Sequence, residues 1–352
     1  MSAIASGLRR PTQFVVPPSL GELHVVFRRL TLIWIGAMLA LGLAATIPSS
    51  VSDLRSEPNP AHDYADAVAR AQRVIDGDNS VVAPGGASIL LAHGARRPRA
   101  AVLLHGLTDS PRQFAALAES LYTLGDNVYV PRLPHHAERG ANVGELSRLT
   151  AEELCRTGDQ AIDIAIGLGD SVVVLGLSAG GTLAAWIGEH RPEVRRVVMV
   201  APALELAHIP SMLNWPLAKL ASRVPNITYR AAPDSARPDR DPGFTTHGVA
   251  QVLRLGWAVR RGADRLTPQA KEMLFLVNSR DRTTKTEPAL ALARLWNKDG
   301  AQARVYEFPD SLGLPHNVVD PVQHPHDASV VYRALEALAD GRPTPPWVRV
   351  RL

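Results

Sequence analysis

The chain has 352 residues, of which 46% are apolar and 20% are charged. This balance excludes wholesale disorder and a protein made of many membrane spans. The formal net charge is +4, and residues 1–29 contribute +3 of it through four arginines and one glutamate, so the rest of the chain is too weakly basic for a nucleic-acid-binding surface. The single cysteine, Cys155, excludes an intramolecular disulfide and a cysteine-based metal cluster.

Residues 30–47 form an apolar segment without a charge, which is just long enough to cross the hydrocarbon core of a membrane as a helix. Four arginines precede this segment and only Arg55 follows it closely. The positive-inside rule then places residues 1–29 in the cytoplasm and the rest of the chain outside it, on the periplasmic or extracellular side. We therefore expect an uncleaved transmembrane anchor. The alternatives are a cleaved signal peptide, which would release a secreted protein, and a helix buried in the core.

The polar, proline-containing residues 48–62 have the composition of a tether, and residues 48–86 lead into the main domain. From residue 87 to about residue 340, short apolar runs alternate with amphipathic runs, without an internal repeat. A capping-box pattern, Thr150 followed by Glu153, marks the start of one helix. The runs predict strands at 101–105, 127–130, 171–175, 196–200, 273–277 and 303–308, and helices at 112–124, 150–166, 179–190 and 328–339.

Strands that are apolar throughout and are separated by helices indicate an α/β fold with a mostly parallel, doubly wound sheet that is covered on both faces. Residues 203–267 interrupt this alternation and predict a helical cap inserted over one edge of the sheet, and residues 341–352 form a C-terminal tail. The apolar residues of the cap either line a site for an apolar chain of a ligand or pack against one another. They include Leu213, Trp215, Leu217, Leu220, Val252, Leu253, Leu255 and Trp257.

The motif Gly176-Leu177-Ser178-Ala179-Gly180 directly follows a predicted strand and precedes a predicted helix. A serine at such a sharp turn takes a strained backbone conformation that lifts its hydroxyl clear of the sheet, and the two flanking glycines leave room for the strand and the helix to cross. The N-terminus of the following helix stabilises negative charge near the oxygen. Ser178 is therefore the candidate nucleophile. The alternative is a chance occurrence of the motif in a chain rich in alanine and glycine.

The segment His105-Gly106-Leu107 ends the first clear strand. We expect the N–H of Leu107 to point to the same place as the N–H of Ala179, the residue after the nucleophile, so that the two donors form an oxyanion hole. His105 itself precedes a glycine turn. This position suits a residue that orients the loop better than it suits the catalytic base.

A serine nucleophile needs a base, and the base needs an orienting carboxylate. Asp281 and His316 each follow a predicted strand, so we expect both at the sheet edge that carries the nucleophile. Their order in the chain is serine, aspartate, histidine. The competing residues are the carboxylates Asp310 and Glu287 and the imidazoles His324 and His326.

With this chain order, residues from about 87 to 340 resemble the α/β-hydrolase superfamily. Within it, residues 105–111 and 130–134 resemble the bacterial carboxylesterase and monoacylglycerol-lipase-like branch. That branch often has Gly-His-Gly after the last proline, whereas this chain has His135-His136-Ala137. The two adjacent histidines lack a convergent third ligand and are expected to be surface loop residues and not metal ligands. The resemblance implies that no cofactor is needed.

These features predict a membrane-tethered serine hydrolase that cleaves carboxylic esters through an acyl-enzyme, with catalytic Ser178, Asp281 and His316. The expected partners are a small-molecule ester or lipid-like substrate and, through residues 30–47, the membrane, but no nucleic acid. One alternative is the same triad in a peptidase, a thioesterase or an acyltransferase. Another is a non-catalytic binding module of the cell envelope that has kept the scaffold, against which the intact triad argues.

Overall fold

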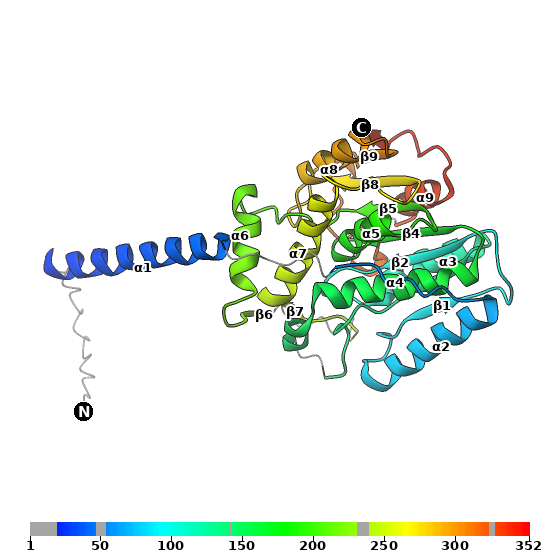
Figure 1. Ribbon diagram of the computed structural model, residues 1–352, viewed down its shortest axis with the longest axis horizontal. Helices are drawn as coiled ribbons and strands as arrows, with labels where there is room; N and C mark the ends of the chain where they lie inside the picture. The colour runs from blue at the N-terminus through cyan, green and yellow to red at the C-terminus, as the bar shows by residue number, and fades with distance from the viewer. Residues whose placement is uncertain (1–19, 47–53, 141–142, 231–238, 324–327) are drawn as a thin grey trace, which may run out of the picture. The chain divides into compact units, whose positions relative to one another are not determined.

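The chain divides into two compact units, Met1–Ile47 and Pro48–Leu352. A computed structural model gives the structure of the protein (Figure 1). It describes residues 20–46, 54–140, 143–230, 239–323 and 328–352.

In the smaller unit, the structure describes helix α1 (Leu20–Thr46). This helix begins ten residues before the expected membrane span of residues 30–47, and it contains Arg28 and Arg29, whose charges oppose burial in hydrocarbon. Among the described residues, no helix combines the length and the apolar character that crossing a membrane requires. The expected transmembrane anchor is therefore wrong. The expected membrane-anchored location of the domain depended on the same helix and is contradicted by the same finding.

The larger unit contains an eight-stranded sheet. Its strands are β1 (Ile89–Leu91), β2 (Ala100–Leu104), β3 (Asn127–Val130), β4 (Val172–Leu177), β5 (Val194–Val200), β8 (Glu272–Asn278), β9 (Ala303–Phe308) and β10 (Arg349–Val350). Their order in the sheet is β1-β3-β2-β4-β5-β8-β9-β10. Neighbouring strands from β3 to β9 are parallel, and the two edge strands are antiparallel to their neighbours. The mostly parallel α/β sheet predicted from the alternating pattern is confirmed.

Helices cover both faces of this sheet. They are α2 (Tyr64–Val81), α3 (Ala115–Thr123), α4 (Ala151–Leu168), α5 (Ala179–His190), α8 (Glu287–Lys298) and α9 (Ala328–Asp340). One core joins α2, α4, α5 and α8 to one face, and a second joins α3 and α9 to the other. Alternate residues of β2 divide between them, with Val102 and Leu104 in the first core and Ala101 and Leu103 in the second. Cys155, on α4, lies in the first core, where burial raises the pKa of its thiol.

The cap lies between β5 and β8 in the chain. It consists of α6 (Ser211–Ala221), β6 (Thr228–Arg230), β7 (Gly243–Thr245) and α7 (Thr246–Gly262). Helices α6 and α7 pack against each other (Figure 1), and the rings of Trp215 and Trp257 stack between them with centroids 4.9 Å apart. Because α7 also packs against α5, the cap is attached to the helix that follows Ser178. Short helical turns complete the fold: η1 (Pro111–Phe114), η2 (Val143–Arg148), η3 (Asp310–Leu312) and η4 (Pro321–Gln323).

The segment before α2 is attached to α4 through a buried ionic network. Asp159 accepts a hydrogen bond from Ser56 Oγ (2.5 Å), and Asp163 accepts one from the Asn59 N–H (2.9 Å). The fully buried Arg191 donates to the same two carboxylates, at 2.9 Å and 2.7 Å. Both aspartates therefore depend on Arg191 for charge compensation.

Replacing Arg191 by methionine is expected to lower the free energy of unfolding by about 3–5 kcal/mol, because two carboxylates would stay buried without their cation. The matched control is Arg96→Met, which removes the exposed pair with Asp170 and should cost no more than about 1 kcal/mol. Urea unfolding measures both values. Equal losses in the two variants would contradict the role assigned to the buried network.

Candidate active site

Ser178 lies at the turn between β4 and α5, with φ 56° and ψ −113°. A residue other than glycine at positive φ is uncommon and indicates local strain. The crossing of strand and helix explains the flanking glycines, since a Cβ on Gly176 would lie 2.1 Å from the Gly180 oxygen and a Cβ on Gly180 would lie 2.0 Å from the Leu104 oxygen. The turn places Ser178 at the start of α5, where the first N–H groups have no acceptor within the helix.

Asp281 follows β8 and His316 follows β9, and the structure brings their side chains together. His316 Nδ1 lies 2.6 Å from Asp281 Oδ2, and the carboxylate also accepts hydrogen bonds from the N–H groups of Thr283 (2.7 Å) and Thr284 (3.1 Å). Burial by itself raises the pKa of Asp281, but the hydrogen bond and charge of His316 and the two N–H groups outweigh it and hold the pKa below its ordinary value. An ionised Asp281 favours the tautomer with the proton on Nδ1, which leaves Nε2 as an acceptor.

Asp310 and Glu287, the competing carboxylates, do not contact His316 in place of Asp281. Within the described part of the chain, neither competing carboxylate makes a hydrogen bond or an ion pair with the imidazole. Asp310 is exposed and accepts a hydrogen bond from Ser279 Oγ, and Glu287 is the exposed first residue of α8. The competing histidines, His324 and His326, lie outside the described residues.

Ser178 and His316 line one cavity of about 590 Å³, a volume typical of small-molecule sites. His316 Nε2 is buried and has no hydrogen-bond partner among the residues that the structure describes. Leu107 and Ala179, the residues expected to supply the oxyanion donors, line the same cavity. Four of the five residues selected in the sequence analysis, Leu107, Ser178, Ala179 and His316, thus line one cavity. The fifth, Asp281, does not line it and contacts His316.

His105 holds the loop that carries Leu107. Its Nδ1 donates to the Gly106 carbonyl (2.9 Å), and its Nε2 accepts a hydrogen bond from the Leu133 N–H (3.0 Å). Burial, with a smaller contribution from the charge of His136, lowers the pKa of His105 well below its ordinary value. The imidazole is therefore neutral and engaged at both nitrogens.

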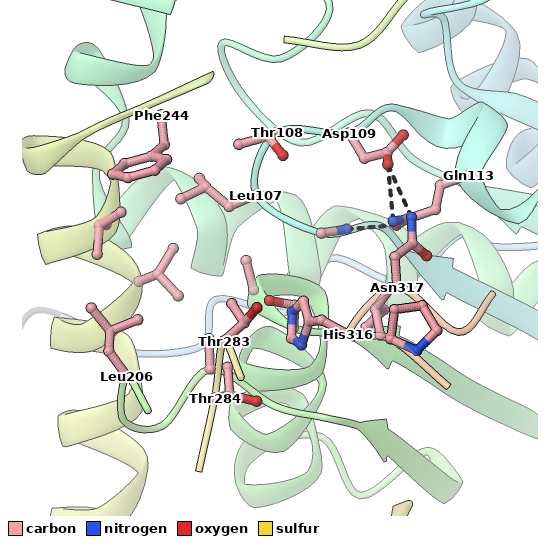
Figure 2. A pocket seen from close by; sticks show the side chains of 18 of the residues that line it. Leu107, Thr108, Asp109, Gln113, Leu206, Phe244, Thr283, Thr284, His316 and Asn317 are labelled. Atoms are coloured by element: carbon pink, nitrogen blue, oxygen red, sulfur yellow. Dashed lines mark hydrogen bonds between the residues drawn. The ribbon is translucent and has the colours of Figure 1, made fainter. Parts of the chain in front are cut away.

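The cavity has an apolar end and a polar end. Figure 2 shows Leu206 and Phe244 at one end, Asp109 and Asn317 at the other, and His316 between them. The apolar end is built from residues of the cap and the segments beside its helices: Leu206, Phe244, Val249, Val252 and Leu253. The polar end contains Thr108, Asp109, Gln113, Arg240 and Asn317.

Two of the eight apolar cap residues singled out from the sequence, Val252 and Leu253, line the cavity. Leu255 instead belongs to the main core, and the two tryptophans stack on each other. The sequence analysis missed the other three residues of the apolar end. Val249 could have been found, because it lies three and four residues before the other two on α7 and so on the same helical face. Leu206 and Phe244 precede the cap helices and carry no periodic signal.

The cap meets the loop of Leu107 through a charged segment before β7. Ser110 Oγ donates to Asp239, and the Asp241 N–H donates to the Thr108 carbonyl (3.1 Å). Burial raises the pKa of Asp241 to about 7, with smaller contributions from the charges of Glu138 and Asp109. These contacts join the segment before β7, the strand that carries Phe244 of the apolar end, to the loop that carries Leu107, an expected oxyanion donor.

Residues 135–137 stand where the resembled branch often has Gly-His-Gly, and two of them have a backbone conformation that favours glycine. His135 and Ala137 have positive φ, at 65° and 57°, a region that glycine adopts without strain. His136 between them is buried, its ring lies edge-on to His105 with centroids 5.0 Å apart, and burial lowers its pKa to about 4. His136 is therefore a buried loop residue and not the surface loop residue expected from the sequence.

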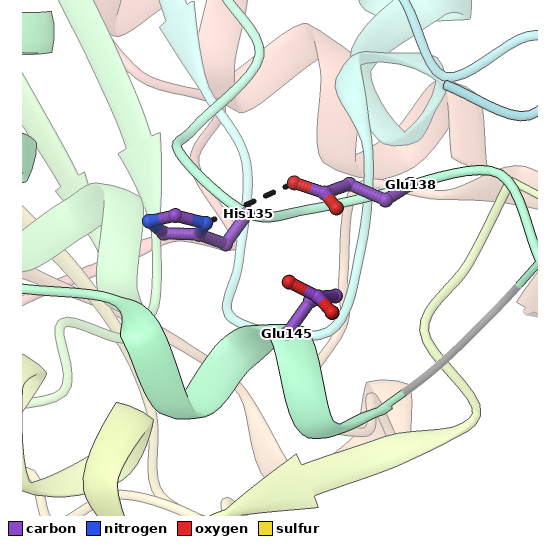
Figure 3. A group of neighbouring side chains, drawn as sticks. All are labelled: His135, Glu138 and Glu145. Atoms are coloured by element: carbon purple, nitrogen blue, oxygen red, sulfur yellow. Dashed lines mark ion pairs between the residues drawn. The ribbon is translucent and has the colours of Figure 1, made fainter. Parts of the chain in front are cut away.

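His135 lies beside Glu138 and Glu145, and their ligand atoms are all within 4.8 Å of one another (Figure 3). An imidazole with two carboxylates suits a transition-metal ion such as Zn²⁺. These groups also have protein partners, since Glu145 pairs with Arg148 (3.0 Å) and His135 Nε2 lies 3.3 Å from Glu153. The group lines no part of the cavity that contains Ser178.

Comparison with known proteins identifies the class. Residues 101–342 match the family model described as the alpha/beta hydrolase family, and this protein belongs to that family. The resemblance inferred from the motifs is thereby confirmed. A thermostable monoacylglycerol lipase of Bacillus sp. (strain H-257) is 29% identical over 185 residues, which cover 52% of this chain and 71% of the lipase.

Two solved structures show the shared fold. One, described with the metagenome-derived lipolytic enzymes LipS and LipT, has a TM-score of 0.56 at 17% identity and covers 74% of this chain and 100% of its own. The other is a soluble variant of monoglyceride lipase from Saccharomyces cerevisiae, with a TM-score of 0.52 at 14% identity over 72% of this chain and 91% of its own.

Proposed function

We propose that the protein is a serine hydrolase that cleaves carboxylic esters through an acyl-enzyme. The observation that carries this proposal is the 2.6 Å contact between Asp281 and His316 at the cavity that Ser178 lines. The similarity to a Bacillus monoacylglycerol lipase supports ester bonds as the target. The strained conformation of Ser178 supports its role as the nucleophile.

In the proposed mechanism, Ser178 Oγ attacks the ester carbonyl while His316 Nε2 accepts the hydroxyl proton. The carbonyl oxygen becomes an oxyanion, which the N–H groups of Leu107 and Ala179 stabilise. His316 returns the proton to the leaving alcohol, and water then releases the acid from the acyl-enzyme by the same steps. Asp281 keeps the imidazole in the required tautomer and stabilises its protonated form.

The two ends of the cavity favour an ester with an apolar acyl chain and a polar alcohol. The acyl chain would lie along the cap residues Leu206, Phe244 and Val249, and the alcohol would face Thr108 and Asn317. A lipid-like monoester fits this division. A peptide would bring amide groups and a short side chain, and not an unbroken alkyl chain, to the apolar end, so esterase activity is favoured over peptidase activity.

A panel of p-nitrophenyl esters from acetate to laurate tests this proposal. We expect kcat/KM to rise about fourfold for each added methylene until the apolar end is filled, because each buried methylene contributes about 0.8 kcal/mol. The variant Val249→Phe should lose the preference for long chains and keep acetate hydrolysis. The control Met212→Phe changes an exposed residue of α6 and should resemble the wild type.

The alternatives predict other results in the same assay. Hydrolysis of p-nitroanilides in preference to the esters would indicate a peptidase. Failure of a fluorophosphonate probe to label the wild-type protein, together with no hydrolysis of any ester, would indicate a non-catalytic module.

A further inference from the structure

A chain of hydrogen bonds begins behind the loop that carries Leu107 and ends beside His316. Gln113, a buried residue of η1, accepts a hydrogen bond from the Gly106 N–H at Oε1 (2.8 Å). Its Nε2 donates to Asp109 Oδ2 (3.0 Å), and Asn317 Nδ2 donates to the same oxygen (3.5 Å). Figure 2 shows these side chains together at the polar end of the cavity.

Asp109 determines which way the Gln113 amide faces. A carboxylate only accepts hydrogen bonds, so the amide must turn its NH₂ toward Asp109 and its oxygen toward the Gly106 N–H. Asp109 is itself 3% exposed, and its Oδ1 accepts a hydrogen bond from the Ser110 N–H (3.1 Å). Arg240 Nε lies 3.8 Å from its Oδ2. Because the Asp109 carboxylate is fixed by these contacts, the Gln113 amide can take only one of its two orientations.

The peptide units on both sides of Gly106 are held. The N–H of Gly106 is bound by Gln113, and its carbonyl accepts hydrogen bonds from His105 Nδ1 (2.9 Å) and the Asp109 N–H (3.2 Å). The Gly106 carbonyl and the Leu107 N–H belong to the same planar trans peptide and point in opposite directions. Fixing the carbonyl therefore also fixes the direction of the Leu107 N–H.

Gly106 also lies next to the nucleophile. A Cβ built on it would be 3.7 Å from both Gln113 amide atoms and from Ser178 Cβ. Glycine is the residue with the greatest backbone freedom, so the direction of the following N–H depends on what holds Gly106.

We infer that Gln113 is a positioning residue, which fixes Gly106 so that the Leu107 N–H points at the reacting carbonyl oxygen, and that Asp109 orients Gln113 for this task. The inference rests on the proposed function, because it assigns Leu107 as an oxyanion donor. Neither residue touches the substrate in this role. Gln113 and Asp109 act on the loop, and Asn317 extends the same network to the segment that carries His316.

The first test is Gln113→Met, which keeps the length of the side chain and removes the acceptor for Gly106. We expect kcat for p-nitrophenyl butyrate to fall by about 10- to 100-fold, because an oxyanion donor contributes about 10²–10³ in kcat and misplacement loses part of this factor. KM should change by less than about threefold, since the oxyanion forms only in the transition state. Hydrogen exchange at the Gly106 N–H, followed by NMR, should become faster.

The second test is Gln113→Glu, which separates positioning from a merely structural role. Its carboxylate can accept from the Gly106 N–H, but when ionised it repels Asp109, and when protonated it donates to Asp109 as the amide does. The ratio of variant to wild-type kcat should therefore rise as the pH is lowered. The same ratio for Gln113→Met should not depend on pH.

The matched control is Asn297→Leu, outside the cavity. The Asn297 amide also holds a backbone N–H, that of Ala303 (2.8 Å), so its loss should lower the melting temperature and leave kcat unchanged. Wild-type kcat in a folded Gln113→Met, or a Gln113→Glu ratio that is flat with pH, would overturn the inference. If the wild type hydrolyses no ester, the proposed function fails, and Gly106 exchange in the wild type and Gln113→Met still decides whether Gln113 holds the loop.

Discussion

Replacing Ser178 by alanine is expected to reduce ester hydrolysis by roughly 10⁴- to 10⁶-fold and to abolish fluorophosphonate labelling, while the fold stays intact. The substitution removes one hydroxyl and keeps the Cβ. The backbone contacts of the turn do not involve that hydroxyl, since the Ser178 N–H donates to the Val200 carbonyl (2.9 Å) and its carbonyl accepts from the N–H groups of Thr182 (2.9 Å) and Ala203 (3.1 Å).

The measurement is steady-state hydrolysis of p-nitrophenyl butyrate, with the melting temperature as a test of folding. Ser110→Ala is the control, because Ser110 contacts the cap through Asp239 and does not line the cavity. It should keep most of the activity. Hydrolysis by Ser178→Ala above about a tenth of the wild-type rate would remove Ser178 from the role of nucleophile.

Asp281→Asn is expected to lower kcat by about 10⁴-fold, because an amide can hold the imidazole in the wrong tautomer and cannot stabilise its positive charge. His316→Ala should be as damaging. Asp310→Asn is the matched control and should retain activity, since Asp310 is exposed and contacts Ser279. A rate for Asp281→Asn within tenfold of the wild type would exclude Asp281 as the orienting carboxylate.

The pH dependence of the wild type checks the same assignment. Acidification should lower the rate, because only a neutral imidazole accepts the serine proton. Asp281 does not contribute to this decline at first: its pKa lies below the ordinary value, so the carboxylate stays ionised until the pH falls below that range. A rate that stays constant on acidification would contradict the assignment of His316 as the base.

The features that the sequence predicts best are those set by residues close together in the chain. The turn at Ser178 requires glycine at fixed spacing on both sides, and the strands of the sheet are apolar throughout because both faces are covered. The prediction of Asp281 and His316 rests on the fact that each follows a predicted strand, and this is also a local feature. These predictions need no knowledge of distant contacts.

What the sequence could not predict depends on contacts that no periodic pattern or motif marks. Phe244 and Leu206 reach the cavity because of the way the cap folds back, and no periodicity marks them. The role inferred for Gln113 depends on a turn that brings it to Gly106, seven residues earlier. The length and apolar character of residues 30–47 predict a membrane anchor, but the helix that forms, Leu20–Thr46, differs from that segment in its bounds and contains two arginines.

The burial of Cys155 has a practical consequence for measuring where the cap helix α6 lies relative to a bound ligand. The chain contains no other cysteine, and a buried thiol with a raised pKa reacts poorly with maleimide dyes at neutral pH. A cysteine introduced at Met212, an 81% exposed position on α6, would therefore take up a fluorophore selectively in an otherwise native chain. The distance from α6 to a fluorescent ester analogue in the cavity then becomes measurable by energy transfer, without first removing a native thiol.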